Sequence, residues 1–89
     1  MMDELKAKLE KYFTKARPLF ERLEASEAGD FNSKKAAEKI IEMAESYYSD
    51  ALHFQSKGEY VNALAALEYA EGWLDAGRYI GLLKGKPVL

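Results

Sequence analysis

The sequence predicts an all-α fold, an antiparallel three-helix bundle in which the second and third helices form a tight hairpin. Apolar residues recur at steps of three and four along most of the chain, and the alternation typical of strands is missing. Glycine-containing breaks at residues 27–33 and at Lys57-Gly58 divide this pattern into three segments. A chain of 89 residues is expected to form one domain, residues 1–89, with one modest core.

The first helix is predicted at about residues 3–26. Pro18 lies inside its apolar pattern, where it removes a backbone donor and crowds the carbonyl of Thr14. We therefore expect a kink or break near residues 15–17. After this helix, Gly29 is suited to a helix-ending left-handed conformation, and Asn32 or Ser33 is suited to cap the next helix.

The second helix is predicted at about residues 33–57 and the third at about 59–83. Only the short link around Gly58 separates them, and so short a link makes neighbouring helices antiparallel. The tail, residues 84–89, is expected to fray.

The third helix carries apolar residues on two sides. One side reads Tyr60, Ala63, Leu64, Leu67, Ala70 and Leu74, and the roughly opposite side reads Ala66, Tyr69, Trp73, Ala76 and Ile80. Two other helices cannot cover both sides completely, and Trp and Tyr are enriched where binding energy concentrates. The second stripe therefore predicts an interface with a protein partner or a second copy, centred on Tyr69 and Trp73.

Composition argues against several classes of function. The net charge is −2, so counterion release on nucleic acid phosphates is not favoured. There is no cysteine, which excludes disulfides and thiolate metal sites and fits a reducing cytoplasm. No apolar run approaches the ~20 residues that span a bilayer, and the N-terminus lacks a signal-peptide core. We expect a cytoplasmic protein that binds neither nucleic acid nor membranes.

Three acids of the third helix, Glu68, Glu71 and Asp75, share one stripe. They are candidates to hold a divalent cation or to act as an acid/base pair, whereas a solvated acidic edge with Asp75 paired to Arg78 is the ordinary alternative. His53, with Asp50 one turn before it, is too small a ligand set for a metal, and a structural role at the helix end is favoured.

Glu71 is unusual because it falls among Leu64, Leu67 and Leu74 on the helical wheel. This position predicts a buried carboxylate, which needs donors. The candidate donors are the hydroxyls of Tyr47 and Tyr48 and the guanidinium of Arg17.

The aromatic residues Tyr69, Trp73 and Tyr79 could belong to the core, to a protein interface or to a stacking site for a small molecule. At helical spacing such residues favour core or interface over a stacking site for a small molecule. Because no glycine-rich phosphate loop or recognisable catalytic triad occurs, no cofactor and no metal are expected.

The run YSDALHFQSKGEYVNALAALEYA resembles a single tetratricopeptide unit. It covers about a quarter of the chain, lacks the terminating proline and has no second copy, which excludes a solenoid.

The longer run YYSDALHFQSKGEYVNALAALEYAEGWLDAGRYIGLL is similar to the archaeal family known as domain of unknown function 357. That resemblance implies an archaeal, cytoplasmic, compact helical domain and carries no activity with it. The chain also loosely resembles helical domains of the HEPN group. Their ribonuclease members place a histidine four to six residues after an arginine, and neither Arg17, Arg22 nor Arg78 stands in that relation to His53.

These observations favour a small non-catalytic interaction or scaffold module that binds a protein partner or associates with itself. One alternative is a metal- or acid-dependent enzyme built on the carboxylates of the third helix with His53. A regulatory nucleotide-binding helical domain is the other alternative. Fold-level likeness does not decide among them.

Overall fold

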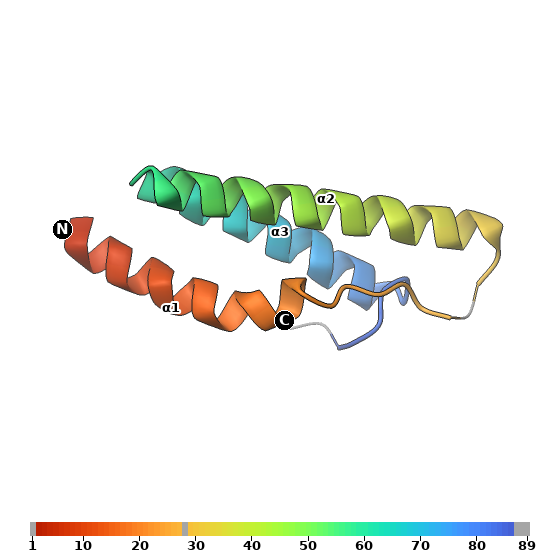
Figure 1. Ribbon diagram of the computed structural model, residues 1–89. Helices are drawn as coiled ribbons and strands as arrows, with labels where there is room; N and C mark the ends of the chain where they lie inside the picture. The colour runs from red at the N-terminus through yellow and green to blue at the C-terminus, as the bar shows by residue number, and fades with distance from the viewer. Residues whose placement is uncertain (1, 28, 87–89) are drawn as a thin grey trace.

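The residues that the structure describes form three α-helices, as predicted. A computed structural model describes residues 2–27 and 29–86. The helices are α1 (Met2–Phe20), α2 (Phe31–Ser56) and α3 (Tyr60–Tyr79). Figure 1 shows α1 and α3 running in one direction and α2 running in the other, with the first turns of α2 extending past the end of α3. The described residues therefore form an all-α antiparallel bundle.

Helix α1 is shorter than predicted and is not broken at residues 15–17. Pro18 lies in its last turn, and the amide of Glu21 still donates to the carbonyl of Arg17 at 3.1 Å. A single missing donor so near the end of a helix interrupts little of the hydrogen-bond ladder. The buried side chains of Phe13, Ala16 and Phe20 hold this turn against the core.

The cap of α2 differs from the prediction. Asp30 is the N-cap, and its Oδ1 accepts a hydrogen bond from the amide of Ser33 at 2.8 Å. The helix consequently starts at Phe31, and the predicted caps Asn32 and Ser33 both lie inside it. Gly29 has a positive φ of 137°, but it precedes this cap instead of ending α1.

The link between α2 and α3 is as tight as predicted. Gly58 adopts a φ of 75°, in the left-handed region that favours glycine. Across this turn the amide of Glu59 donates to the carbonyl of Phe54 at 2.9 Å. The chain therefore reverses within three residues, and α2 and α3 pack along each other as a hairpin.

Helix α3 ends at Tyr79, before the predicted residue 83, because Gly81 takes a φ of 78° and turns the chain back. The returning segment lies beside the loop after α1: the amide of Ser26 donates to the carbonyl of Leu82 at 2.8 Å, and Ala25 and Leu83 form an isolated antiparallel bridge. Leu83 is only 2% exposed and belongs to the core. Figure 1 shows these two segments side by side.

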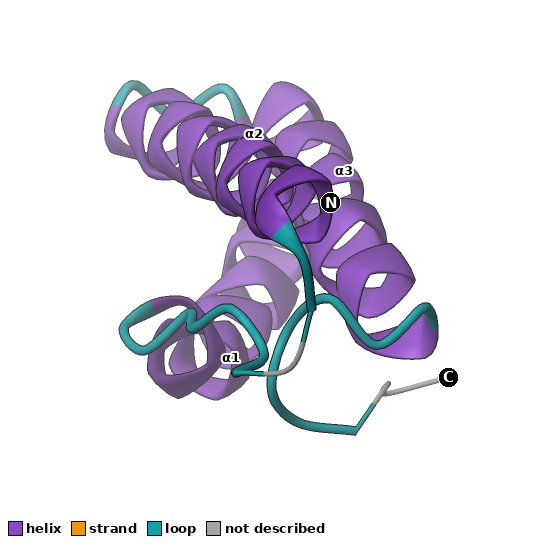
Figure 2. Cartoon of the chain, turned by 90° about the vertical axis from the view of Figure 1, so that its right-hand side faces the viewer, coloured by secondary structure: helices purple, strands orange, loops and turns teal. Residues whose placement is uncertain are grey.

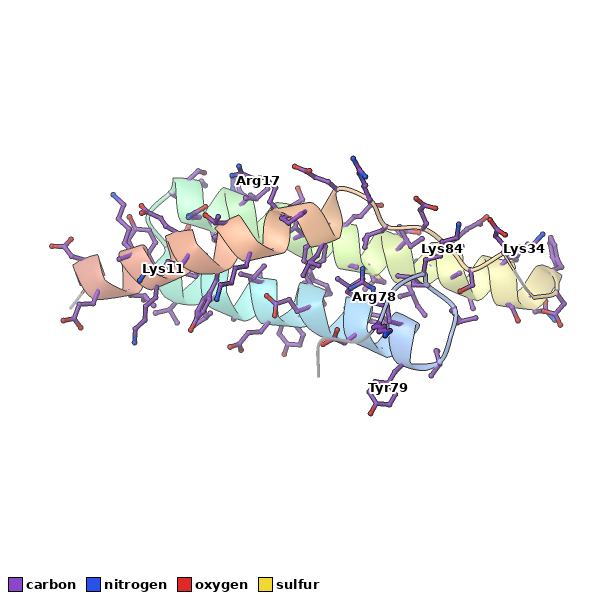
Figure 3. All side chains as sticks on the ribbon, turned by 90° about the horizontal axis from the view of Figure 1, so that it is seen from below. Lys11, Arg17, Lys34, Arg78, Tyr79 and Lys84 are labelled. Atoms are coloured by element: carbon purple, nitrogen blue, oxygen red, sulfur yellow. The ribbon has the colours of Figure 1, made fainter. Side chains whose placement is uncertain are left out.

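Lys84 is held in place, contrary to the expected fraying. Its amide donates to the carbonyl of Glu24 at 2.9 Å, and its Nζ lies 3.1 Å from Glu24 Oε2 and 3.3 Å from Glu27 Oε1. Arg78 Nε donates to the carbonyl of Lys84 at 3.1 Å, and the two side chains are labelled in Figure 3. Residues 87–89 of the predicted tail lie outside the described residues.

The α2/α3 hairpin has small residues along its seam. The buried members are Ala37, Ala44 and Ala51 on α2 and Ala63, Ala70 and Gly77 on α3, each series spaced by seven. A seven-residue repeat keeps one seam facing the partner helix, and small side chains let the two backbones approach closely. The α2/α3 pair is accordingly the most closely packed part of the bundle.

Helix α1 packs differently, through larger side chains. Leu9, Phe13 and Phe20 are buried, and the ring of Phe20 stacks on Tyr48 of α2 at a centroid distance of 4.5 Å. Figure 2 shows α1 running beneath the α2–α3 pair. Because large side chains separate α1 from its neighbours, a groove remains between α1 and α3.

Candidate interaction surface

The second apolar side of α3 lies largely at the surface, beside a matching flank of α2. We call this surface the α2/α3 face. Its members are Ile40, Met43, Tyr47 and Phe54 of α2 and Tyr69, Trp73, Ala76 and Ile80 of α3. Tyr69 is 62% exposed and Ile80 is 65% exposed, while Trp73 is half-buried. Tyr47 stacks on Tyr69 at 5.3 Å between centroids, which joins the two helices across the face.

Two details correct the predicted stripe. Ala66 is only 7% exposed, so it belongs to the core and not to the surface. Its place on the helix lies toward the α2 seam, where the hairpin covers it. Tyr47, predicted only as a possible donor to Glu71, also belongs to this face. Its spacing of seven from Ile40 and from Phe54 places it on one flank of α2 and is the signal by which it could have been found.

Charged residues surround this face but do not enter it. By helical spacing, the members of the face and their neighbours Ala36 on α2 and Asn62 on α3 are uncharged, while Asp50 follows Met43 by seven residues and so stands at the edge of the face. Charges appear at the rim, with Lys39 and Asp50 on α2 and Glu68 on α3. Charged residues are 31% of the chain. An uncharged flank across two helices is therefore a distinctive surface, and depletion of charge is typical of interface cores.

Beside Tyr69 and Trp73, the face is hollowed. A shallow depression of about 260 Å³ is lined by Glu68, Tyr69, Gly72, Trp73 and Ala76. A side chain added at Gly72 would meet nothing within 4 Å, so the depression opens directly over the backbone of α3. An apolar side chain of a partner would have room there.

Tyr79 does not belong to this face. Its side chain is 73% exposed and points away from the bundle, as Figure 3 shows. Tyr69, Trp73 and Tyr79 consequently form no common stacking site, since ten residues of helix place Tyr69 and Tyr79 on different sides of α3.

A second candidate site is the groove between α1 and α3. It has a volume of about 200 Å³ and is lined by Tyr12, Lys15, Ala16, Leu19, Glu71, Leu74 and Asp75. Glu71 is exposed at its edge, so the predicted buried carboxylate is wrong. Leu74 fills the core beneath it, and the width of the groove leaves the carboxylate in contact with solvent.

The proposed donors for Glu71 serve other purposes. Tyr47 stacks on Tyr69 and Tyr48 stacks on Phe20, and within the described part of the chain no hydrogen bond or ion pair joins Glu71 to either tyrosine or to Arg17. Partial burial, with the nearby charges of Asp75 and Glu68, raises the pKa of Glu71 above its ordinary value. The carboxylate is thus set among like charges.

The remaining chemical candidates are dispersed. His53 is exposed near the end of α2, with its ring centroid 6.3 Å from that of Phe54. Glu71 lies roughly 16 Å along α3 from Tyr60, the first residue after the hairpin turn, so His53 and the acidic stripe occupy different parts of the bundle. Among residues 2–27 and 29–86, no group of three His, Cys, Asp or Glu is placed to hold a metal ion.

The described residues thus define a three-helix bundle whose most distinctive surface is an uncharged aromatic face on its hairpin. The chain belongs to the DUF357 family, described as proteins of unknown function, whose model matches residues 11–83. The match includes the whole α2/α3 face and ends at Leu83. No curated protein and no solved structure matches the chain. In the described part of the chain, no helix is both long enough and apolar enough to cross a membrane.

Proposed function

We propose that this protein is a small non-catalytic interaction module that binds another protein surface through the α2/α3 face. The observation that carries the proposal is the stacked pair Tyr47–Tyr69, with half-buried Trp73 one turn further along α3, on a face where Tyr69 and Ile80 are exposed and charged residues stand only at the edge. Aromatic residues on a rigid helical surface lose little conformational entropy on binding and supply most of the energy at protein interfaces. The tight α2/α3 seam gives this surface a fixed shape.

The titratable side chains that could act in catalysis, Glu71 and His53, support a binding role better than a catalytic one. A catalytic acid or base is expected in a cleft with a positioned partner. Here Glu71 stands at the open edge of the α1/α3 groove, and His53 is exposed near the hairpin turn, in a different part of the bundle. A cytoplasmic location is part of the proposal and rests on the cysteine-free sequence.

The test uses a tagged chain purified from the cells in which it naturally occurs. We expect a defined protein, at a constant ratio to the chain, to co-purify with the wild type and to be lost with Tyr69→Glu, because a charge would enter an uncharged interface. Trp73→Glu should have the same effect while leaving much of the helical content intact. Tyr79→Glu is the matched control, since it adds the same charge to an exposed tyrosine on another side of α3.

Circular dichroism of each variant separates lost binding from lost folding. Equal recovery of the partner with wild type and with folded Tyr69→Glu would refute the proposed role of the face. So would loss of the partner with Tyr79→Glu alone.

A further inference from the structure

We infer that the protein surface bound at the α2/α3 face is a second copy of this chain, related by a twofold axis that passes α2 between Lys39 and Asp50. The inference rests on the proposed function and adds the identity of the partner. Two observations support it. Lys39 and Asp50 at the rim of α2 have opposite charges and a spacing that suits a twofold axis, and that axis falls at Gly72 on α3.

Lys39 and Asp50 are the charged residues of α2 at the rim of the face, on either side of Met43 and Tyr47. They are eleven residues apart, which places them within about 20° of each other around the helix and roughly 16 Å apart along it. Both are exposed, and they carry opposite charges. The rim of α2 therefore has a positive end and a negative end.

This arrangement is self-complementary in one orientation. If a second copy packs with its α2 antiparallel, Lys39 of each copy meets Asp50 of the other, and a twofold axis forms both pairs at once. A parallel second copy would instead place like charges together, which is destabilising. The axis must then pass midway, at the level of Ala44 and Glu45.

The structure of α3 at that level agrees with this position. Tyr47 stacks on Tyr69, so these two residues mark one level of the hairpin. Because α3 runs opposite to α2, the level of Ala44 and Glu45 corresponds to residues 71–72 on α3. Gly72 lies there, and a side chain at this position would meet open space. The axis derived from the charges of α2 thus falls where α3 offers a bare backbone.

The side chains next to the axis complete the fit. Tyr69 precedes Gly72 by three residues, and Trp73 and Ala76 follow it. A twofold axis at Gly72 carries the partner's exposed tyrosine toward Trp73 and Ala76, beside the depression of about 260 Å³ that these residues line. Aromatic side chains from both copies would fill this hollow and exclude water from the centre of the interface.

The existing contact of Lys39 does not oppose the proposal. Its Nζ lies 3.4 Å from Glu42 Oε1, with the two side chains 65% and 67% exposed. Exposed pairs of this kind contribute little and exchange readily. Lys39 is therefore available to a carboxylate on a neighbouring chain.

The experiment is sedimentation equilibrium on the purified full chain and on charge-reversal variants. We expect the wild type to dimerise and Lys39→Glu and Asp50→Lys each to weaken dimerisation by roughly tenfold, since two attractive pairs become repulsive. Mixing the two variants should restore dimers. The Lys39→Glu chain carries negative charge at both rim positions and the Asp50→Lys chain carries positive charge at both, so a mixed dimer pairs opposite charges at both places. Glu42→Gln is the control and should leave the dissociation constant within about twofold of wild type.

A steric variant tests the position of the axis without using charge. Gly72→Gln places a side chain where the monomer has open space, so the fold should persist and dimerisation should be lost. Dimers that survive Gly72→Gln, or variants that fail to pair on mixing, would overturn the inferred geometry.

Failure of this inference and failure of the proposed function give different results. A wild-type chain that stays monomeric at high concentration, yet loses a different co-purifying protein with Tyr69→Glu, overturns the second copy and leaves the interaction face standing. A monomer with no partner sensitive to Tyr69→Glu overturns both. Both the interaction face and the second copy are supported if the wild type forms a dimer, Tyr69→Glu abolishes it, and mixing Lys39→Glu with Asp50→Lys restores dimers.

Discussion

Gly77 of α3 lies directly beneath Leu83, which the returning chain brings back over it. A Cβ at position 77 would stand 2.7 Å from Leu83 Cδ1 and 3.0 Å from Ile40 Cγ2. Packing therefore requires either glycine at this position or a shift of the Leu83 side chain, at the point where α2, α3 and the C-terminal segment meet.

A matched pair of glycine substitutions tests this requirement. Gly72→Ala should stabilise the monomer by about 1 kcal/mol, because alanine favours a helix and its methyl group meets nothing within the chain. Gly77→Ala gains the same propensity but must displace Ile40 and Leu83, and overpacking typically costs about 1 to 3 kcal/mol. Denaturant unfolding should place Gly77→Ala below Gly72→Ala by that margin. Equal stability of the two variants would contradict the close contact.

The turn at Gly58 can be tested without any packing effect. A Cβ there meets nothing within 4 Å, so Gly58→Val reports only the cost of a positive φ. We expect a loss of about 1 to 2 kcal/mol or more for this β-branched residue. Gly58→Asn is the control, since asparagine tolerates this conformation better. A melting temperature for Gly58→Val equal to that of the wild type would remove the proposed turn.

Leu83 should contribute to stability as a core residue although it follows the last helix. Leu83→Ala is expected to cost about 2 to 5 kcal/mol, as for other fully buried leucines. Ile80→Ala removes a comparable side chain from an exposed position and should change stability by no more than about 0.5 kcal/mol. Chemical denaturation followed by circular dichroism measures both. If the two changes are alike, the C-terminal segment does not pack as described.

The Asp30 cap makes the stability of α2 depend on pH. The Ser33 amide bonded to Asp30 lowers the pKa of this carboxyl below its ordinary value of 3.8. A lowered folded-state pKa gives stability that is present above the unfolded value and is lost as the pH falls through the folded one. At neutral pH, Asp30→Ala should melt at a lower temperature than the wild type. On acidification it should lose less stability than the wild type does. Asp30→Asn keeps an acceptor, so its loss at neutral pH should be smaller. Thermal melts from neutral to acidic pH compare the three chains, and parallel pH curves would exclude the cap.

Glu71 should have the opposite dependence on pH. Its pKa is raised above the ordinary 4.5, so the folded state holds the proton more tightly and stability falls as the pH rises from the unfolded value through the folded one. Glu71→Gln removes repulsion by Glu68 and Asp75 and should stabilise the chain by roughly 0.4 to 1 kcal/mol at neutral pH. Urea unfolding at neutral and at acidic pH provides the comparison. A variant less stable than wild type at neutral pH would show that the carboxylate has a favourable partner.

Sequence periodicity predicted the helices, the hairpin and the two apolar sides of α3, because all three depend on local spacing. It misplaced the ends of α1 and α3. Leu23 and Ala25 continue an apolar pattern, but they pack on the core from a non-helical segment. Leu82 and Leu83 do the same after the chain turns at Gly81. The spacing of apolar residues indicates which residues are buried, but it does not indicate whether those residues are themselves helical.

The candidate site was predicted in part for a similar reason. Tyr69 and Ile80 lie at the surface as a two-sided helix requires, whereas Ala66 lies on the border between the sides. Burial at such a border depends on the distance between α2 and α3. The small residues of α2 set that distance. Glu71 was misjudged because its wheel position gave no information on how far α1 would stand from α3.

The seven-residue spacing of the α2/α3 seam also bears on the order in which the molecule folds. Contacts such as those near Ala51 and Ala63 join residues that are close in the chain, so they form after little loop closure. The bridge between Ala25 and Leu83 instead joins distant parts of the chain. The hairpin should therefore be the nucleus, and α1 should dock late. In chevron measurements, Ala44→Gly would slow folding, whereas Leu9→Ala would chiefly speed unfolding.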